Sequence, residues 1–301
     1  DFNQAIREAA AHVGSASSPR RNHSARYHAH HGRAHLEQHS AITINEDTVN
    51  ILVTNDDGID SPGIYALAQA LRDVGNVVVV APDRQQSAVG HALTVNSPLR
   101  ATPFHRNDEF FGLAVDGTPA DCVKLGLSTL IKEPIDLIVS GINFGYNTAI
   151  NVLYSGTVSA ATEGVMLGIP SIAVSLGSFS WEANCDAAAQ TARYLASRYF
   201  ELEIPAGTVL NVNVPDLPAD AIRGLKVTKQ GHGEWIDTYE RRLDPMGKEY
   251  YWIKGTYRNL DGDSLSDDVA VEEGFVAVTP ITFKLTDAPT MRKLSEKLES
   301  M

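Results

Sequence analysis

The stretch ILVTNDDG, residues 51–58, contains the pattern that decides the fold. It begins with an apolar run of strand length and ends at an asparagine, the adjacent carboxylates Asp56 and Asp57, and a glycine. Apolar residues with helical spacing follow over residues 62–74, and Pro62 suits a first helical turn. This order of strand, acidic turn and helix predicts the first unit of an open α/β sheet, in which ligands bind beyond the carboxyl ends of the strands.

The same alternation continues along the chain. Further buried strands are predicted at residues 77–81, 136–140, 169–175 and 208–214. Helices are predicted at residues 123–130, from residue 155 onward, and at residues 184–200. Residues 91–95 and 110–115 read as two hairpin-like strands inserted between them. The pattern predicts a Rossmann-like, doubly wound, mostly parallel sheet as the main domain, residues 48–215.

The two ends of the chain differ from this domain. Residues 216–301 are rich in strands and turns, with strands predicted at 224–228, 249–255 and 274–280 and a helix at 290–298. Such short strands rarely form a core alone, so this part is expected to pack on the sheet domain or on a neighbouring subunit. Residues 1–47 hold seven of the ten histidines and little periodic apolar character. We interpret them as a solvated extension, with adventitious metal binding and a targeting peptide as the alternatives.

Composition narrows the possible partners. The 301 residues are 43% hydrophobic, enough for a substantial core, and carry a formal net charge of −12. That charge argues against nucleic acid as a partner, because phosphate binding needs a concentrated basic face. No apolar run approaches the roughly 20 residues that span a membrane, and no signal-peptide segment precedes the first strand. Cys122 and Cys185 are expected to be reduced core residues, and the protein to be cytoplasmic.

Polar residues end several predicted strands at the same edge of the sheet. Asp56 and Asp57 follow the first strand, Ser87 lies after the second, and Asn143 follows the strand at 136–140. Two carboxylates brought together favour a shared proton or a hard cation, and the oxygen donors of Ser87 and Asn143 suit Mg²⁺ or Mn²⁺ better than zinc. An isolated Asp-Asp-Gly would more often be only a turn or a helix cap. Here four segments agree, so we predict one divalent-cation site.

An anion site is predicted beside this cation. Ser155, Gly156 and Thr157 begin a helix whose first amides can bind a phosphate, and Asn147 lies in a Gly/Asn loop that lets a ligand approach the backbone. A cation next to such amides suits hydrolysis of phosphate monoesters. Asp56 and Asp57 are the catalytic candidates, and Asp57 either orients or deprotonates the water or acts only as a ligand. His91 either reaches the leaving group or is a hydrogen-bonded histidine in a strand.

Four ordered motifs resemble the survival protein E (SurE) family of nucleotidases. They are ILVTNDDGIDSPG at 51–63, APDRQQSAVGHALT at 81–94, DGTPADCVKL at 116–125, and the segment 140–164 that contains SGINFGYN and YSGTVSAATEG. The similarity extends from about residue 50 to about residue 286. One departure is visible: where the family usually reads Asn-Leu-Gly-Asp-Asp-Val, residues 147–152 read NTAINV, without the glycine and the acids.

The resemblance implies a phosphatase that depends on a divalent metal and acts on nucleoside 5'- and 3'-monophosphates, with short polyphosphate as a further substrate of some members. It places the metal ligands at Asp56, Asp57, Ser87 and Asn143. It also implies a C-terminal portion that exchanges elements between protomers, giving a homodimer or a homotetramer.

Two other functions are compatible with an acidic pair after the first strand. A phosphoacceptor module of the response-regulator kind is much shorter and needs an acceptor aspartate at a later strand end, where this chain offers Ser87, Asn143 and Ser175. A dinucleotide-binding oxidoreductase needs a Gly-x-Gly-x-x-Gly after the first strand, and none is present there.

Overall fold

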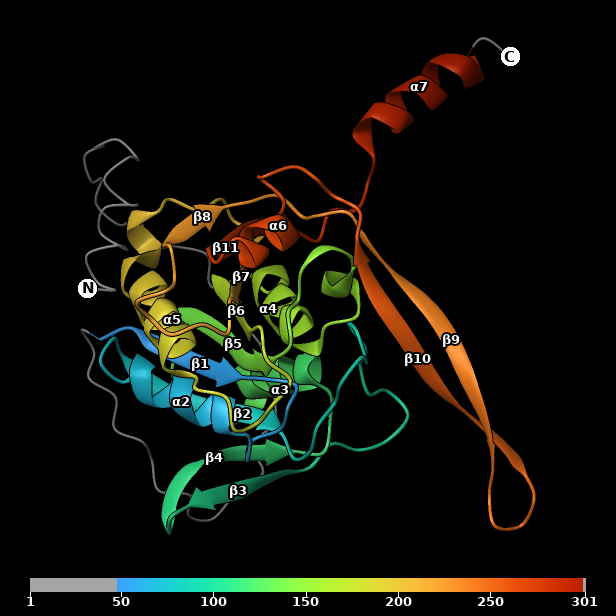
Figure 1. Ribbon diagram of the computed structural model, residues 1–301. Helices are drawn as coiled ribbons and strands as arrows, with labels where there is room; N and C mark the ends of the chain where they lie inside the picture. The colour runs from blue at the N-terminus through green and yellow to red at the C-terminus, as the bar shows by residue number, and fades with distance from the viewer. Residues whose placement is uncertain (1–47, 300–301) are drawn as a thin grey trace.

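A single sheet of nine strands organises the computed structural model, which describes residues 48–299 (Figure 1). Its order is β3-β4-β2-β1-β5-β6-β7-β11-β8. The strands are β1 (Asn50–Thr54), β2 (Asn76–Pro82), β3 (Ala101–Arg106), β4 (Glu109–Val115), β5 (Leu137–Phe144), β6 (Ser171–Leu176), β7 (Thr208–Val214), β8 (Leu225–Val227) and β11 (Val276–Thr282). The prediction for residues 1–47 lies outside the described residues.

The central strands run parallel, which confirms the predicted doubly wound sheet. β1 pairs in parallel with β2 and β5, and β5, β6 and β7 continue the series. Only the pairs β3/β4 and β7/β11 of this sheet are antiparallel. The helices are α2 (Pro62–Leu71), α3 (Pro119–Leu125), α4 (Gly156–Met166), α5 (Asp186–Arg198), α6 (Asp267–Glu272) and α7 (Ala288–Glu299).

The apolar runs of the central strands are buried on both faces. Successive side chains of a strand point to opposite faces, so Ile51 and Val53 join the core cluster formed with α2 and α5. Leu52, between them, joins the cluster formed with α3 and α4. Burial on both faces explains why β1 reads as a continuous apolar run. Both cysteines are free and buried, as predicted.

The strand predicted at residues 91–95 was wrong. β3 lies at Ala101–Arg106 instead and pairs with β4, while residues 91–95 form an irregular segment. Side chains around the start of α3 take the place of a strand ladder: the Thr94 amide donates to the Asp121 carboxylate at 3.1 Å, and the Thr118 hydroxyl donates to the Ala92 carbonyl at 2.8 Å. The alternating sequence therefore marks a loop that α3 holds in place.

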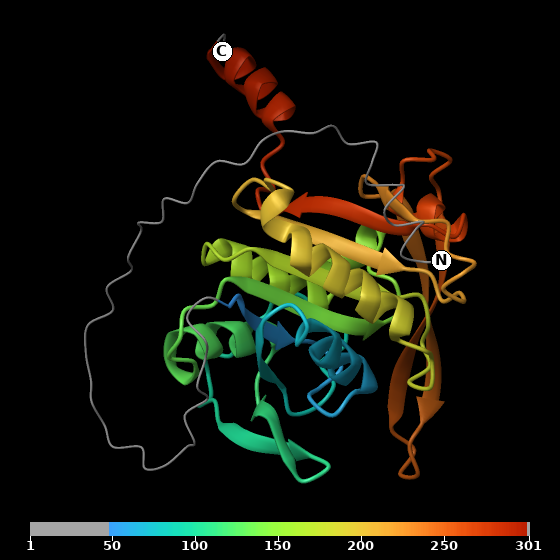
Figure 2. The same cartoon turned by 90° about the vertical axis from the view of Figure 1, so that its left-hand side faces the viewer.

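The C-terminal part both extends the sheet and projects from it. β11 pairs with β7 on one side and with β8 on the other. By contrast, β9 (Gly233–Leu243) and β10 (Glu249–Asn259) form a separate antiparallel hairpin that reaches away from the body, and α7 also stands clear of it (Figures 1 and 2). β9 was not predicted, because charges scattered along it interrupt any two-residue period of apolar residues. None of the described helices is long and apolar enough to cross a membrane.

Candidate functional site

The two acidic residues lie at the carboxyl end of the central strand β1. Asp56 and Asp57 are only 4% and 3% exposed. Their turn is rigid because the side-chain amide of Asn55 donates to the Gly58 carbonyl and to the Ser61 hydroxyl, both at 2.9 Å. Ser61 is also the N-cap of α2. Strand and helix thus hold the carboxylates at the sheet edge that the sequence predicted.

Asp57 contacts the last residue of β5 and the loop that follows β2. Its Oδ2 accepts a hydrogen bond from the Phe144 amide at 3.1 Å, and its Oδ1 accepts one from the Gln85 side chain at 3.3 Å. Burial, and to a smaller extent the neighbouring charge of Asp56, raises the pKa of Asp57 to about 6. The carboxylate is thus held by two donors but is costly to charge without a cation.

Asp56 is tied to the beginning of α4. Its Oδ1 accepts a short hydrogen bond from the Thr157 hydroxyl. Burial raises the pKa of Asp56, while hydrogen bonds from Thr157 and from the amides of Gly156 and Thr157 act in the opposite direction. A Cβ on Gly156 would lie 2.7 Å from the Cβ of Asp56, so only glycine permits this approach. The carboxylate therefore satisfies the helix terminus as a capping group does.

This pair has the properties of a cation site. Two adjacent buried carboxylates repel each other, and among residues 48–299 no lysine, arginine or histidine forms an ion pair with either. Those residues also contain no cluster of three or more His, Cys, Asp or Glu side chains able to hold a metal. A cation at Asp56 and Asp57 must therefore complete its shell with neutral oxygen atoms, which favours a hard ion such as Mg²⁺.

Ser87 and Asn143 are the predicted neutral ligands. Ser87 is exposed, and the residue before it is fixed to the acidic turn, because the Gln86 amide donates to the Asp56 carbonyl at 2.7 Å. Asn143 lies one residue from Phe144, where the register between β5 and β6 shifts. Its Nδ2 donates to the Gly145 carbonyl at 2.7 Å, which leaves Oδ1 as the free end of the amide. The structure thus brings the segments carrying both residues to Asp56 and Asp57.

The predicted phosphate ligands have other partners in the structure. The Ser155 hydroxyl accepts from the Val158 amide at 3.1 Å as the N-cap of α4, and Thr157 binds Asp56. Asn147 is buried: its Nδ2 donates to the Ser175 hydroxyl at 2.8 Å, and its backbone amide donates to Asn213 at 2.8 Å. These residues support the acidic pair and its loops, and their binding of phosphate stays a prediction.

His91 forms a network that sequence spacing could not reveal. Its Nε2 lies 2.8 Å from the buried carboxylate of Glu163, which also accepts from Lys124 at 2.8 Å. The hydrogen bond from His91, helped by Lys124, lowers the pKa of Glu163 against the effect of burial. His91 is thus hydrogen-bonded, although it lies in a loop and not in a strand, and its contact with the leaving group stays a prediction. The network fixes that loop, which also carries Ser87, to α3 and α4.

Residues of the C-terminal part hold the loop after Asn147 in place. The buried carboxylate of Asp267 accepts from the amides of Ala149 at 3.2 Å and Gly231 at 2.8 Å, and Gln230 donates to the Ala149 carbonyl at 2.7 Å. Ala149 has a φ of 45° and stands where the related motif has glycine. These hydrogen bonds hold an alanine in a conformation that favours glycine.

Ala149→Gly is expected to stabilise the protein by about 1 kcal/mol, because glycine adopts positive φ without steric cost. Urea unfolding of the two proteins measures the difference. The matched control is Ala66→Gly in the middle of α2, where glycine is expected to destabilise by about 1 kcal/mol. Equal losses at the two positions would contradict the strained conformation of Ala149.

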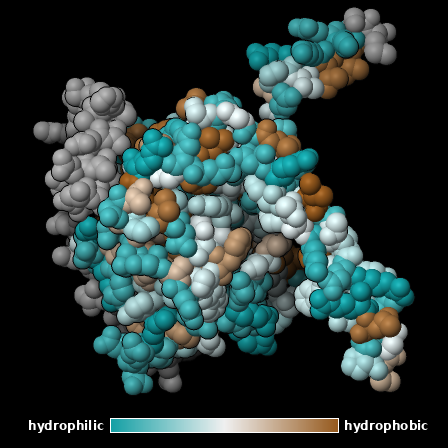
Figure 3. Space-filling view, viewed as in Figure 1, coloured by the Kyte–Doolittle hydropathy of each residue, from teal (hydrophilic) through white to brown (hydrophobic). Residues whose placement is uncertain are grey.

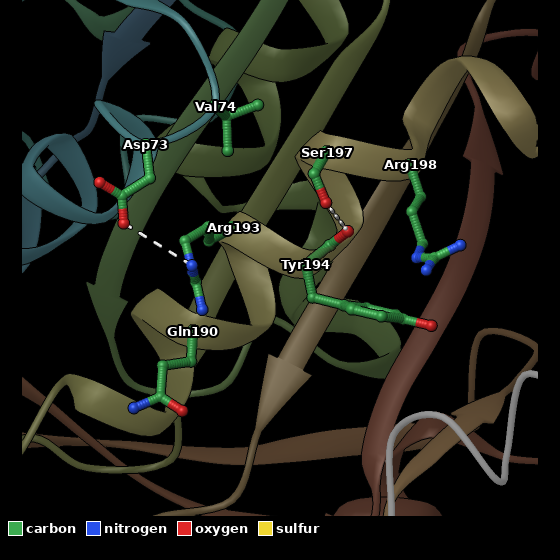
Figure 4. Close-up of a pocket in the computed structure, with 7 residues that line it drawn as sticks. All are labelled: Asp73, Val74, Gln190, Arg193, Tyr194, Ser197 and Arg198. Carbon is green, nitrogen blue, oxygen red and sulfur yellow. Dashed lines mark hydrogen bonds and ion pairs between the residues drawn. The ribbon is translucent and has the colours of Figure 1, made fainter. Parts of the chain in front are cut away.

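A shallow cavity of about 230 Å³ lies away from the acidic pair (Figure 4). It is lined by residues of α5 and by Asp73, which follows the carboxyl end of α2, whereas the acidic pair precedes the other end of that helix. Its Arg193 and Asp73 form an exposed ion pair at 3.6 Å. Exposed pairs of this kind contribute little energy, and the cavity takes no part in the chemistry of the acidic pair.

The fold and the site define a doubly wound α/β protein with paired carboxylates at the carboxyl edge of its sheet. The family model "Survival protein SurE" matches residues 51–237, and the chain belongs to this family. Proteins named 5'-nucleotidase SurE are 49% identical to it in Syntrophobacter fumaroxidans, over 79% of this chain and 95% of the relative, and in Geobacter sulfurreducens, over 79% and 90%. The crystal structure of the SurE protein from Aquifex aeolicus superposes with a TM-score of 0.71 at 41% identity, covering 83% of this chain and 99% of that one.

Proposed function

We propose that this protein is a 5'-nucleotidase that hydrolyses nucleoside monophosphates, including 3'-monophosphates, with the help of one divalent cation per subunit. The observation that carries the proposal is the pair of adjacent, buried carboxylates without a cationic partner among the described side chains. The names of the relatives support the substrate class. Short polyphosphate is a further candidate substrate.

Asp56, Asp57, Ser87 and Asn143 would hold the cation, which is Mg²⁺ or Mn²⁺ by the chemistry of these oxygen donors. When bound, it supplies neutralisation of phosphate charge and activation of a water. The two carboxylates have different partners in the protein: the Thr157 hydroxyl donates to Asp56, and the Phe144 amide donates to Asp57. In the reaction a water oxygen bonds to phosphorus, the bond to the nucleoside oxygen breaks, and that oxygen takes a proton. We propose that Asp57 orients or deprotonates this water in addition to binding the cation.

Release of inorganic phosphate tests the function. AMP incubated with the protein and Mg²⁺ or Mn²⁺ is expected to give adenosine and phosphate, and excess EDTA is expected to stop the reaction. No release under any of these conditions would refute the proposal. Phosphate transfer to the protein itself would favour the phosphoacceptor alternative, and reduction of a nicotinamide cofactor would favour the oxidoreductase.

We also propose that the protein is a homodimer or a homotetramer that works in the cytoplasm. The β9–β10 hairpin exposes large apolar side chains, among them Trp252 and Ile253, and α7 buries none of its residues. Figure 3 shows hydrophobic side chains on both projecting elements. A second copy of this chain is the partner that would cover them. The two free buried cysteines support a reducing compartment.

Leu294→Asp is expected to shift the protein toward smaller assemblies. Met291, Leu294 and Leu298 are exposed and lie on one face of α7, so a charge there would face any partner subunit. Light scattering after size-exclusion chromatography measures the mass. The control, Lys293→Asp, puts an acidic side chain on the opposite face of α7 and should leave the assembly intact. Equal masses for wild type and Leu294→Asp would show that α7 does not join subunits.

A further inference from the structure

An aromatic surface begins one residue away from the acidic pair. The backbone amide of Phe144 donates to Asp57, and the ring of Phe144 stacks on Trp181 with 6.4 Å between ring centroids and 28° between planes. Trp181 belongs to the loop that follows β6 and is 44% exposed. A single residue, Phe144, therefore contacts the catalytic carboxylate with its backbone and an exposed indole with its side chain.

A second ring of the same loop, that of Phe179, lies against Gly145, the residue that follows β5. A Cβ added to Gly145 would come within 2.6 Å of Cε1 of Phe179, so the Phe179 ring covers the place where a side chain would be. Phe179 is nevertheless 86% exposed. The Phe179 ring therefore contacts the residue next to Phe144, whose amide donates to Asp57. The α-carbons of these two neighbouring residues are roughly 3.8 Å apart.

The start of this loop is fixed to the sheet. The Gly177 amide donates to the Val214 carbonyl at 2.9 Å, and a side chain at Gly177 would collide with the ring of Tyr146. The strands on either side thus determine where Phe179 and Trp181 emerge. An exposed aromatic side chain is costly to leave in water, and its flat apolar face is the usual partner of a nucleobase.

We propose that Phe179 and Trp181 form a stacking surface for the base of the substrate, so that the phosphate lies at Asp56 and Asp57 while the base lies on this loop. The inference rests on the proposed function. It makes Phe179 a specificity-determining residue: the surface distinguishes a nucleoside monophosphate from a phosphate ester without a base, such as ribose 5-phosphate.

Phe179→Ala tests the proposal against two substrates. Aromatic stacking on a base contributes an affinity that corresponds to roughly 5- to 100-fold. We expect KM for AMP to rise by about that factor, with little change in kcat, and KM for ribose 5-phosphate to stay the same. Phe179→Tyr keeps the aromatic face and should retain the wild-type KM for AMP. The matched control is Phe200→Ala. Phe200 is an exposed phenylalanine just beyond the other end of α5, and its removal should change KM for neither substrate.

Binding separates this inference from the proposed function. Calorimetry in EDTA compares the affinities of AMP and ribose 5-phosphate for wild type and Phe179→Ala. Preferential binding of AMP that Phe179→Ala removes would support the surface even if wild type hydrolysed no nucleotide. Equal AMP affinities for the two proteins, an equal loss for both ligands, or a changed oligomeric mass in Phe179→Ala would overturn the inference, the last by showing that the ring contacts a subunit.

Discussion

Asp57→Asn is expected to lower kcat/KM for AMP by about 10³-fold or more while the protein stays folded. The substitution removes one of the two charged oxygen donors of the proposed cation site, and a catalytic cation stabilises the transition state by several kcal/mol. The Phe144 amide still finds an oxygen on the asparagine side chain, so the turn should persist. Phosphate release measures activity, and circular dichroism checks the fold.

Asp60→Asn provides the matched control for this prediction. Asp60 lies three residues further along the same turn, but its side chain is exposed. It should retain wild-type activity. In the metal-free protein, Asp57→Asn should also raise the free energy of unfolding by about 1 kcal/mol or more, because it relieves two neighbouring buried charges. Normal turnover by Asp57→Asn would show that the acidic pair is only a turn.

Burial on both faces explains which strands the sequence predicted. β1 and β6 are buried along their whole length, so every residue except Asn50 is apolar or carries only a small hydroxyl group, and the run stands out. β9 faces solvent along most of its length, and charges are scattered among its aromatic residues, which gives no comparable pattern. Its equally exposed partner β10 was predicted in part, at residues 249–255, because it contains the strand-favouring run 250–253. Residues 91–95 misled for the opposite reason: they alternate like a half-buried strand, but Leu93 and Val95 are exposed, and backbone groups there bind side chains at the start of α3 and not a neighbouring strand.

Strand order explains which parts of the site were predictable. Parallel strands end at one edge, so the polar residues that follow β1, β2 and β5 could be gathered there without knowing any contact. The hydrogen-bond partners of the individual carboxylates could not be predicted in this way. Phe144 is 87 residues from Asp57, and Thr157 is 101 residues from Asp56. No spacing rule reaches across such separations, so the hydrogen bond from the Thr157 hydroxyl to the Asp56 carboxylate could not be predicted from the sequence.

Asp267→Ala is expected to destabilise the protein by about 3 kcal/mol or more. The Asp267 carboxylate is buried and accepts from the backbone amides of Ala149, Gly231 and Asp268. Its removal leaves these donors without a partner, and each buried unsatisfied group costs about 1–3 kcal/mol. Urea unfolding measures the loss. The control is Asp220→Ala, whose side chain is exposed and which should change stability by less than about 0.5 kcal/mol.

The ionisation of Asp267 adds a dependence on pH. Burial, assisted by the charge of Asp268, raises its pKa from 3.8 to about 6, despite the amides that donate to it. The folded protein therefore keeps this proton to higher pH than the unfolded chain does, and the stability contributed by Asp267 falls as pH rises from about 4 to about 6. Asp267→Asn cannot lose a proton, so the stability of wild type relative to this variant should fall by about 2 kcal/mol between pH 4 and pH 7. A constant difference over that range would mean that Asp267 ionises in the folded protein as it does in the unfolded chain, and that its amide donors fully offset its burial.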